Sequence, residues 1–149
     1  MPGHFIVRYD RPAAPLYIDP FHKGLLLSED DCAQRLRSMH GADFVFRRSF
    51  LDPVGKRQIL TRMLTNLKAI YVRQGDALRA LAAVERIVLL QPHDPGEIRD
   101  RGLLRSRTGK LDEAVTDLVR YLDLRPQAPD GEAVRELLHT LARVSKRRN

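Results

Sequence analysis

The sequence predicts a mainly α-helical protein built from stacked helix-turn-helix units. One observation is an internal repeat at an offset of 34 residues, in which three positions match: Gly75, Ala80 and Pro92 recur as Gly109, Ala114 and Pro126. A second is the spacing of apolar residues by three and four from residue 57 onward, which is the period of an amphipathic helix. A fixed period with Gly, Ala and Pro in matching positions is typical of helical arrays that hold other molecules.

Composition and charge exclude several classes of protein. A single cysteine, Cys32, rules out an internal disulfide and a zinc site made of several cysteines. No apolar run approaches the roughly 18 residues of a membrane-spanning helix, and residues 1–10 lack a signal-peptide pattern. We therefore expect a cytoplasmic protein without membrane contact.

The positive charge is concentrated at the C-terminus. The net charge is +7, of which +4 lies in residues 143–149. A short basic end is more often solvated than a binding arm, so nucleic acid is a disfavoured partner and contact through this tail is the weaker alternative.

The N-terminal region predicts a β-hairpin followed by one helix. Residues 5–9 and 16–21 are rich in β-branched and aromatic side chains and flank the turn-forming residues 10–15. A lone hairpin is marginal in water, so we expect residues 1–27 to pack on the helices, to pair with another chain or to be poorly ordered. Exposed strand edges also favour a homo-oligomer.

A helix is expected to begin at Ser28, with Asp31 as its reciprocal cap, and to end near Gly41. Residues 40–56 are expected to be irregular, because Pro53 and Gly55 break regular structure.

The first helical pair follows from Arg57. Its first helix is expected to end at Gly75, because glycine adopts a left-handed C-terminal cap at little cost. The apolar face of this helix comprises Ile59, Leu60, Met63, Leu64, Leu67, Ile70 and Tyr71. The second helix ends at Pro92, and its inward residues are Ala77, Ala80, Leu81, Val84, Ile87 and Val88.

The second pair repeats this plan. Asp94, Pro95 and Glu97 predict a helix start, with Asp as the cap and Pro at the first position, and Gly109 predicts its end. The partner helix carries the apolar residues Leu111, Ala114, Val115, Leu118, Tyr121 and Leu122. A last helix over 130–145 is expected to cover the exposed side of this pair with Val134, Leu137, Leu138 and Leu141.

These positions resemble the tetratricopeptide repeat (TPR) over residues 61–128. The first unit matches the TPR pattern at Leu64, Leu67, Tyr71, Gly75, Ala80 and Pro92, and the second at Gly102, Gly109, Ala114, Leu118 and Pro126. Three residues depart from it. Lys68 stands where a small residue is usual, and Arg101 and Arg105 stand where apolar residues are usual. We expect the two arginine stems to lie along apolar surface with their heads in water.

The resemblance implies a concave groove, formed by the first helix of each pair, that binds a peptide or another protein. The matched groove residues are Arg62, Thr65, Asn66, Ala69, Arg73, Arg99, Leu103 and Arg107. Four arginines favour an acidic or carboxylate-terminated ligand, because guanidinium pairs with carboxylate through two hydrogen bonds. The alternatives are that these charges are simply solvated, or that another part of the same protein fills the groove. Two units are few, since about three are usually needed for independent stability.

The front segment resembles the end of the transglutaminase-like domain in a group of bacterial proteins, where TPR units follow directly. The motifs are GHF at residues 3–5 and IDPF at residues 18–21. The implied organisation is a transglutaminase-like remnant over 1–56, a TPR-like domain with a capping helix over 57–145, and a basic tail over 146–149.

In that family a Cys nucleophile is activated by a His, which an Asp orients. The motifs place His4 and Asp19 in the last two roles. The family's Cys starts a helix well upstream of the His, whereas Cys32 lies downstream and is expected to pack as a small apolar group. The chain therefore resembles the back portion of a larger protein, as a truncated gene product, a mis-assigned start or a cloned fragment.

Two functions follow from this sequence. The leading one is a protein-interaction scaffold without catalysis of its own and without a cofactor, in which His4 and Asp19 have no present chemistry. Its partner is a protein or peptide, acidic by the groove argument, or the chain's own missing N-terminal domain. The alternative is part of a Cys-His-Asp acyltransferase or hydrolase whose nucleophile lies in a missing upstream segment. The histidines show no close metal-ligand spacing, and no phosphate-binding glycine loop is present, so no metal is expected.

Overall fold

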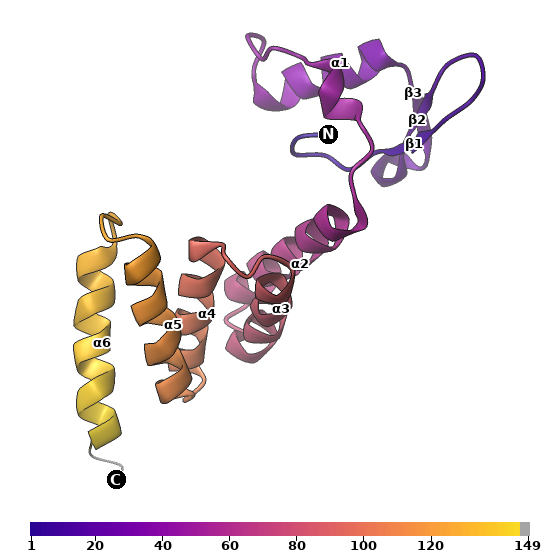
Figure 1. Ribbon diagram of the computed structural model, residues 1–149. Helices are drawn as coiled ribbons and strands as arrows, with labels where there is room; N and C mark the ends of the chain where they lie inside the picture. Colours follow the sequence, from indigo (N-terminus) through magenta and orange to yellow (C-terminus); the bar gives the residue numbers. More distant parts are fainter. Residues whose placement is uncertain (147–149) are drawn as a thin grey trace. The chain divides into compact units, whose positions relative to one another are not determined.

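A computed structural model describes residues 1–146 of the chain, which form two compact units: Met1–Val54 and the residues from Gly55 onward (Figure 1). Of the predicted basic tail over 146–149, residues 147–149 lie outside the described residues.

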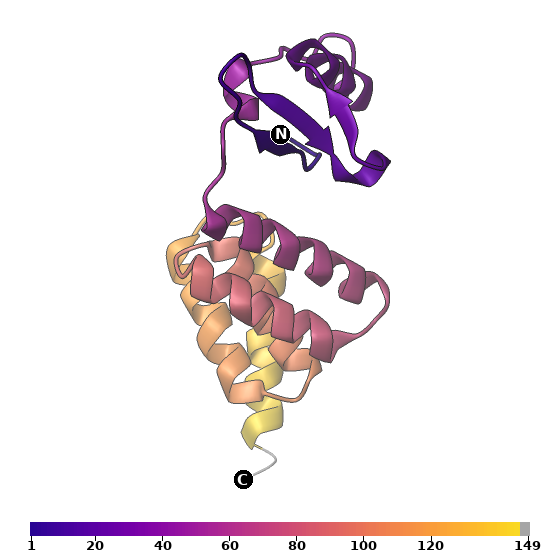
Figure 2. The same cartoon turned by 90° about the vertical axis from the view of Figure 1, so that its right-hand side faces the viewer.

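The N-terminal unit contains a three-stranded antiparallel sheet in the order β1-β2-β3 (Figure 2). Strand β1 spans Val7–Tyr9, β2 spans Leu16–Asp19 and β3 spans Leu25–Leu27. The predicted hairpin is confirmed, and β3 is a third strand that was not predicted. It follows a short 3-10 turn, η1 (Pro20–His22), and a tight turn in which Lys23 and Gly24 both have positive φ.

Helix α1 (Glu29–His40) begins with the predicted capping box, because Ser28 and Asp31 exchange side-chain to backbone hydrogen bonds. Residues 41–54 are irregular apart from the 3-10 turn η2 (Arg48–Leu51). A core of Tyr17, Leu27, Cys32 and Leu51 joins the sheet to α1 and η2. The hairpin is therefore stabilised by packing on its own helix, which is one of the three outcomes expected for residues 1–27.

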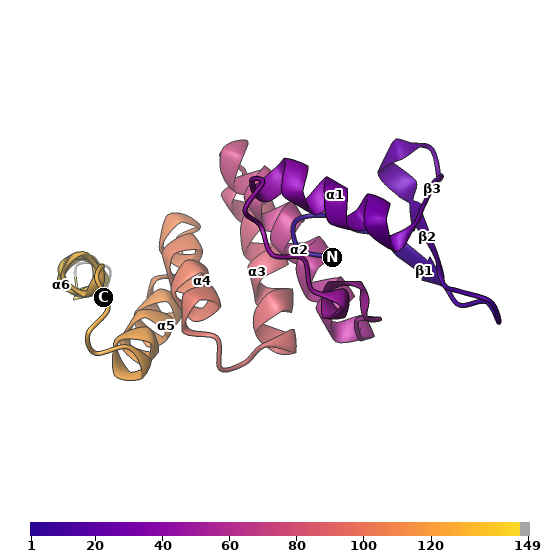
Figure 3. The same ribbon diagram turned by 90° about the horizontal axis from the view of Figure 1, so that it is seen from above.

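The second unit is a row of antiparallel helices in which each helix packs on the next. The helices are α2 (Lys56–Arg73), α3 (Ala77–Leu90), α4 (Pro95–Arg107), α5 (Leu111–Leu124) and α6 (Gly131–Lys146). Figure 3 shows α6 beyond α5, at the end of the row away from α2. Two helix-turn-helix pairs and a capping helix are thus confirmed.

The turns inside the two pairs have the same geometry. Gly75 and Gly109 have φ values of +73° and +81°, where glycine is favoured. In each turn the residue after glycine donates its N–H to the carbonyl five residues earlier, from Asp76 to Tyr71 and from Lys110 to Arg105, both at 2.9 Å. This bond satisfies a carbonyl that the helix end would otherwise leave unpaired.

Small residues let the helices of the array approach closely. Ala80 and Ala114 are fully buried, as the repeat pattern predicts. At Gly102 a Cβ atom would lie 2.8 Å from Cγ of Leu118 on α5, closer than real Cβ contacts occur. The apolar face of α2 differs from the expected core face, because α2 has no fully buried residue and Leu60, Met63, Leu67 and Ile70 are exposed.

The expectation that the heads of Arg101 and Arg105 lie in water is wrong. Arg101 binds both carboxylate oxygens of Asp117, at 2.8 and 2.6 Å, and Arg105 binds one of them at 2.8 Å. Asp117 lies on α5 and is 2% exposed. Nothing in the sequence marks this carboxylate, because it stands among the apolar residues of an inward helical face.

We predict that Gly102→Ala destabilises the repeat unit by about 1–2 kcal/mol, because the added methyl group collides with Leu118 and overpacking outweighs the helix propensity gained. Urea unfolding followed by circular dichroism measures the change. Gly131→Ala is the matched control, since its Cβ would meet Leu122 at an ordinary 3.7 Å. Equal stability of both variants would contradict the close approach of α4 and α5.

Candidate functional site

The structure brings His4 and Asp19 together in the N-terminal unit. Asp19 ends β2 and caps η1, because its Oδ1 accepts the backbone N–H of Phe21 at 3.0 Å. Its other oxygen, Oδ2, lies 2.8 Å from Nε2 of His4. His4 follows Gly3, which has a φ of +68° and whose Cβ would meet Met39 at 3.1 Å. The GHF motif thus places the imidazole over the end of β2.

Two further side chains, neither of them predicted from the sequence, bind the same carboxylate. Nδ1 of His22 lies 2.8 Å from Oδ2 of Asp19, and the guanidinium of Arg35 binds this oxygen as well. Arg35 also lies 2.9 Å from Nδ1 of His22. No motif marks either residue, although His22 follows Asp19 by three positions and Arg35 lies about two turns after Ser28, the cap of α1. We call these four residues, His4, Asp19, His22 and Arg35, the Asp19 cluster.

The environment of Asp19 keeps its carboxylate ionised. Burial alone would raise its pKa, but the hydrogen bonds from His4, His22 and the backbone of Phe21 outweigh burial and hold the pKa well below its ordinary value. An ionised carboxylate only accepts hydrogen bonds, so Nε2 of His4 is the donor. In the neutral ring the nitrogen without a proton is then Nδ1.

An open cavity of about 530 Å³ adjoins the cluster. His4, His22 and Arg35 line its polar side, while Leu25, Leu27 and Met39 contribute apolar surface. Such a lining suits a ligand with one polar and one apolar part.

The environment of Cys32 does not suit a nucleophile. It is fully buried in the core of the unit, where burial raises its pKa to about 11. The thiol therefore stays protonated at neutral pH, and thiolate is the reactive form. Its packing as a small apolar group agrees with the sequence analysis.

The cluster also has the composition of a metal site. Ligand atoms of His4, Asp19 and His22 lie within 4.8 Å of one another. However, the guanidinium of Arg35 already supplies a positive charge to the same oxygen of Asp19. A bound cation would have to displace it against charge repulsion, so the residues present fit a hydrogen-bonded His–Asp site better than a metal site.

The groove residues predicted for the repeat unit occupy two helices. On α2, Arg62 is half-buried, and the exposed residues are Thr65, Asn66, Ala69 and Arg73. On α4, Arg107 is exposed, whereas Arg99 and Leu103 are half-buried. Leu103 packs against the core of the second pair.

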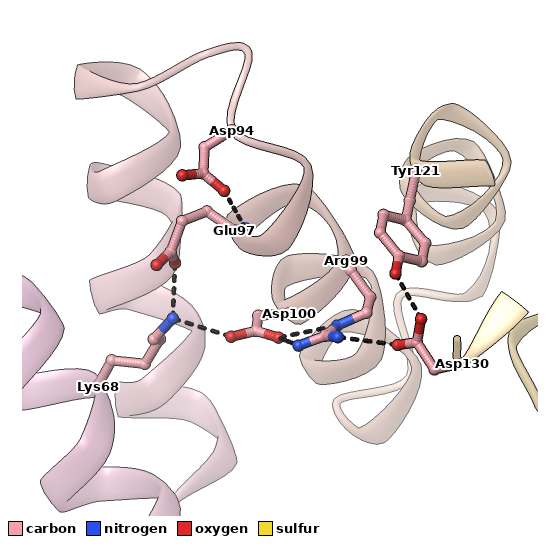
Figure 4. Close-up of polar contacts among 7 residues, drawn as sticks. All are labelled: Lys68, Asp94, Glu97, Arg99, Asp100, Tyr121 and Asp130. Carbon is pink, nitrogen blue, oxygen red and sulfur yellow. Dashed lines mark hydrogen bonds and ion pairs between the residues drawn. The ribbon is translucent and has the colours of Figure 1, made fainter. Parts of the chain in front are cut away.

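A network of charged residues crosses the array beside these positions (Figure 4). Nζ of Lys68 on α2 bonds to Glu97 at 2.7 Å and to Asp100 at 2.9 Å, both on α4. Arg99 bonds to Asp100 and, at 2.8 Å, to Asp130 before α6. Lys68 stands where the repeat pattern usually has a small residue, and its ion pairs join one helical pair to the next.

The network ends at a second open cavity of about 620 Å³, lined by Arg99, Tyr121, Arg125, Pro126 and Asp130. The hydroxyl of Tyr121 donates to Asp130 at 2.5 Å. Hydrogen bonding to Asp100 and Asp130 outweighs burial and raises the pKa of Arg99. A ligand at this end would compete with two carboxylates for Arg99, so this arginine is less available than the prediction of four groove arginines implies.

No helix within residues 1–146 combines the length and apolar character needed to cross a membrane.

Comparison with known proteins gives a family match for each half of the chain. Residues 1–65 match the transglutaminase-like superfamily, and residues 67–139 match the tetratricopeptide repeat family. These two matches confirm the resemblance drawn from the GHF, IDPF and repeat positions.

Relatives among curated bacterial proteins align over much of the chain. It is 36% identical over 137 residues to a UPF0162 protein of Xylella fastidiosa, covering 90% of this chain and 49% of that protein. It is 28% identical over 142 residues to the UPF0162 protein YchA of Escherichia coli, covering 95% of this chain and 52% of that protein. Protein SirB1 of Salmonella typhimurium is 30% identical over 92 residues, which is 62% of this chain and 34% of that protein. The chain thus spans about half the length of the first two relatives.

We predict that Asp19→Asn lowers the urea midpoint of the N-terminal unit at pH 7, because it leaves Arg35 without its carboxylate. Asp10→Asn, at an exposed ion pair with Arg8, is the control. The folded pKa of Asp19 is depressed, so its stabilisation is present above the unfolded pKa of about 3.9 and is lost as the pH falls below it. Urea titrations followed by amide NMR signals of residues 1–54 should therefore show a smaller difference at pH 3 than at pH 7. A difference that is the same at both pH values would contradict the ionised state of Asp19.

Proposed function

We propose that this chain, which matches the transglutaminase-like superfamily over residues 1–65 and the tetratricopeptide repeat over residues 67–139, acts as a protein-interaction scaffold with no catalysis of its own. Tetratricopeptide repeats generally mediate contacts between proteins, through the concave face of the stacked pairs. The ligand that fits the groove residues is an acidic or carboxylate-terminated peptide. The absence of catalysis is part of the proposal, and the burial and raised pKa of Cys32 support it.

The observation that carries the scaffold proposal is the pair Arg73 and Arg107. They occupy matching positions of the two units, 34 residues apart, and both are exposed. Arg99, in contrast, already binds Asp100 and Asp130. Two exposed guanidinium groups on successive first helices suit two carboxylates of one extended peptide.

We predict that the double variant Arg73→Glu/Arg107→Glu weakens binding of a short polyglutamate peptide with a free carboxyl terminus by about tenfold or more, as the loss of charge-assisted hydrogen bonds requires. Isothermal titration calorimetry on the full chain measures it. The charge-matched control is Arg79→Glu/Arg86→Glu on α3, the second helix of the first pair.

The proposal of an acidic-peptide groove is overturned if the groove variant binds the peptide as well as the parent chain does. It is also overturned if the control variant weakens binding equally. The first result would place the ligand elsewhere, and the second would show attraction to overall charge.

A second candidate function rests on the 2.8 Å contact between His4 and Asp19. In a thiol-dependent acyl transfer, Nδ1 of His4 would take the proton of a thiol supplied by a segment outside this chain. The thiolate then attacks an acyl carbon, and the imidazolium returns its proton to the leaving group. Asp19 would hold the ring in place and stabilise its positive charge, as the carboxylate of a catalytic triad does.

We predict for this candidate that a longer form of the protein, containing an upstream cysteine, hydrolyses an activated ester such as p-nitrophenyl acetate. His4→Ala should then lower the rate by about 100-fold or more, the usual contribution of a general base. His139→Ala, on α6, is the control. An in-frame stop codon close upstream of Met1, or a rate unchanged by His4→Ala, would exclude the candidate.

A further inference from the structure

Helix α2 carries an exposed apolar stripe. Its residues Leu60, Met63, Leu67 and Ile70 are 49%, 57%, 40% and 38% exposed. They follow one another at spacings of three, four and three, which is the spacing of the a and d positions of a coiled coil. A stripe of this spacing fits the apolar face of another helix, over about 15 Å at 1.5 Å per residue.

The second unit of the array shows how the position that matches Ile70 is covered. Leu104 stands 34 residues after Ile70 and is only 5% exposed. It packs with Ala80, Leu81 and Val84 of α3, the helix that precedes α4 in the row. In the second unit a preceding helix therefore covers this position of the first helix. On α2 the same position is exposed.

The charged residues of α2 indicate which kind of partner helix would bind the stripe. It contains Lys56, Arg57, Arg62, Lys68 and Arg73 and no acidic residue. Lys68 is neutralised by Glu97 and Asp100 on α4. Lys56 is in line with the stripe, four residues before Leu60, and Arg73 follows Ile70 by three, so basic groups stand at both ends.

A second copy of α2 would meet these basic groups with the same charge, which is unfavourable. A helix with acidic flanks would meet them with the opposite charge. Charge complementarity thus distinguishes the two occupants.

We propose that the stripe Leu60, Met63, Leu67 and Ile70 is a docking site for an amphipathic helix of another protein, with apolar a and d positions and acidic flanks. The partner helix covers Ile70 of α2 as α3 covers Leu104 of α4. This site lies on a different face of α2 from Thr65 and Ala69 of the groove, about half a turn away by the 100° step of a helix. It goes beyond the proposed function and does not require the groove to bind an acidic peptide.

The test uses the full chain and a synthetic helical peptide with Leu at a and d and Glu at e and g. Fluorescence anisotropy should show binding that weakens by about tenfold or more when Lys replaces Glu in the peptide. Leu67→Asp should weaken binding by a similar factor, because it places a carboxylate in the apolar contact. The matched control is Leu89→Asp on α3, an 81% exposed leucine outside the stripe, which should leave binding unchanged.

Met63→Lys is the second stripe variant, and circular dichroism checks that each variant is folded. The proposal is overturned if the Glu peptide does not bind, if it binds the stripe variants as well as the parent chain, or if the Lys peptide binds equally. It is also overturned if analytical ultracentrifugation shows a dimer that Leu67→Asp dissociates, since the occupant is then a second copy. Arg107→Glu should affect polyglutamate binding and not helix binding, so failure of the groove and failure of this site are distinguishable.

Discussion

The second helical pair depends on the carboxylate of Asp117, which is buried between α4 and α5. A carboxylate removed from water is costly by several kcal/mol unless it is paired and hydrogen-bonded. Arg101 meets this need with two hydrogen bonds and Arg105 adds a third. The repeat family usually has apolar residues at the two arginine positions. This chain instead has three charged residues at this contact, whose burial is favourable only because they pair with one another. Arg105 also contacts Glu113 at 3.0 Å and Glu85 at 3.6 Å, which extends the contact to the preceding pair.

Asp19 has the same role in the N-terminal unit, with a different chemical consequence. It too is buried and bonded to an arginine, but two of its partners are histidines. Histidine changes charge near neutral pH, whereas arginine does not. The first buried carboxylate therefore holds helices together, while the second holds an imidazole beside an open cavity. This difference is why the N-terminal unit offers a candidate catalytic site and the repeat unit a candidate binding site.

Local signals in the sequence were sufficient to predict most of the fold. Gly75 and Gly109 end helices because of their backbone conformation, and Ser28 with Asp31 begins one, so each is readable without tertiary structure. Leu25–Leu27 was missed as a strand because three apolar residues have no period of their own, and pairing with β2 decides their structure. His4 and Asp19 were found by motif. Arg35 and Asp117 were not, because a charged residue joins such a cluster through contacts made only in the folded chain.

The same tertiary contacts decide which charges of the repeat unit are available to a ligand. Position 102 is glycine in the second unit, where α5 approaches closely, whereas the matching position 68 is a lysine that reaches Glu97 and Asp100. Arg99 is held in the same network by Asp100 and Asp130. Counting arginines along the groove therefore overstates its positive charge toward a ligand. The ligand preference of the array depends instead on basic groups such as Arg73 and Arg107, which stand exposed at matching positions, while the pairing of Lys68 and Arg99 fixes how the successive helices are held.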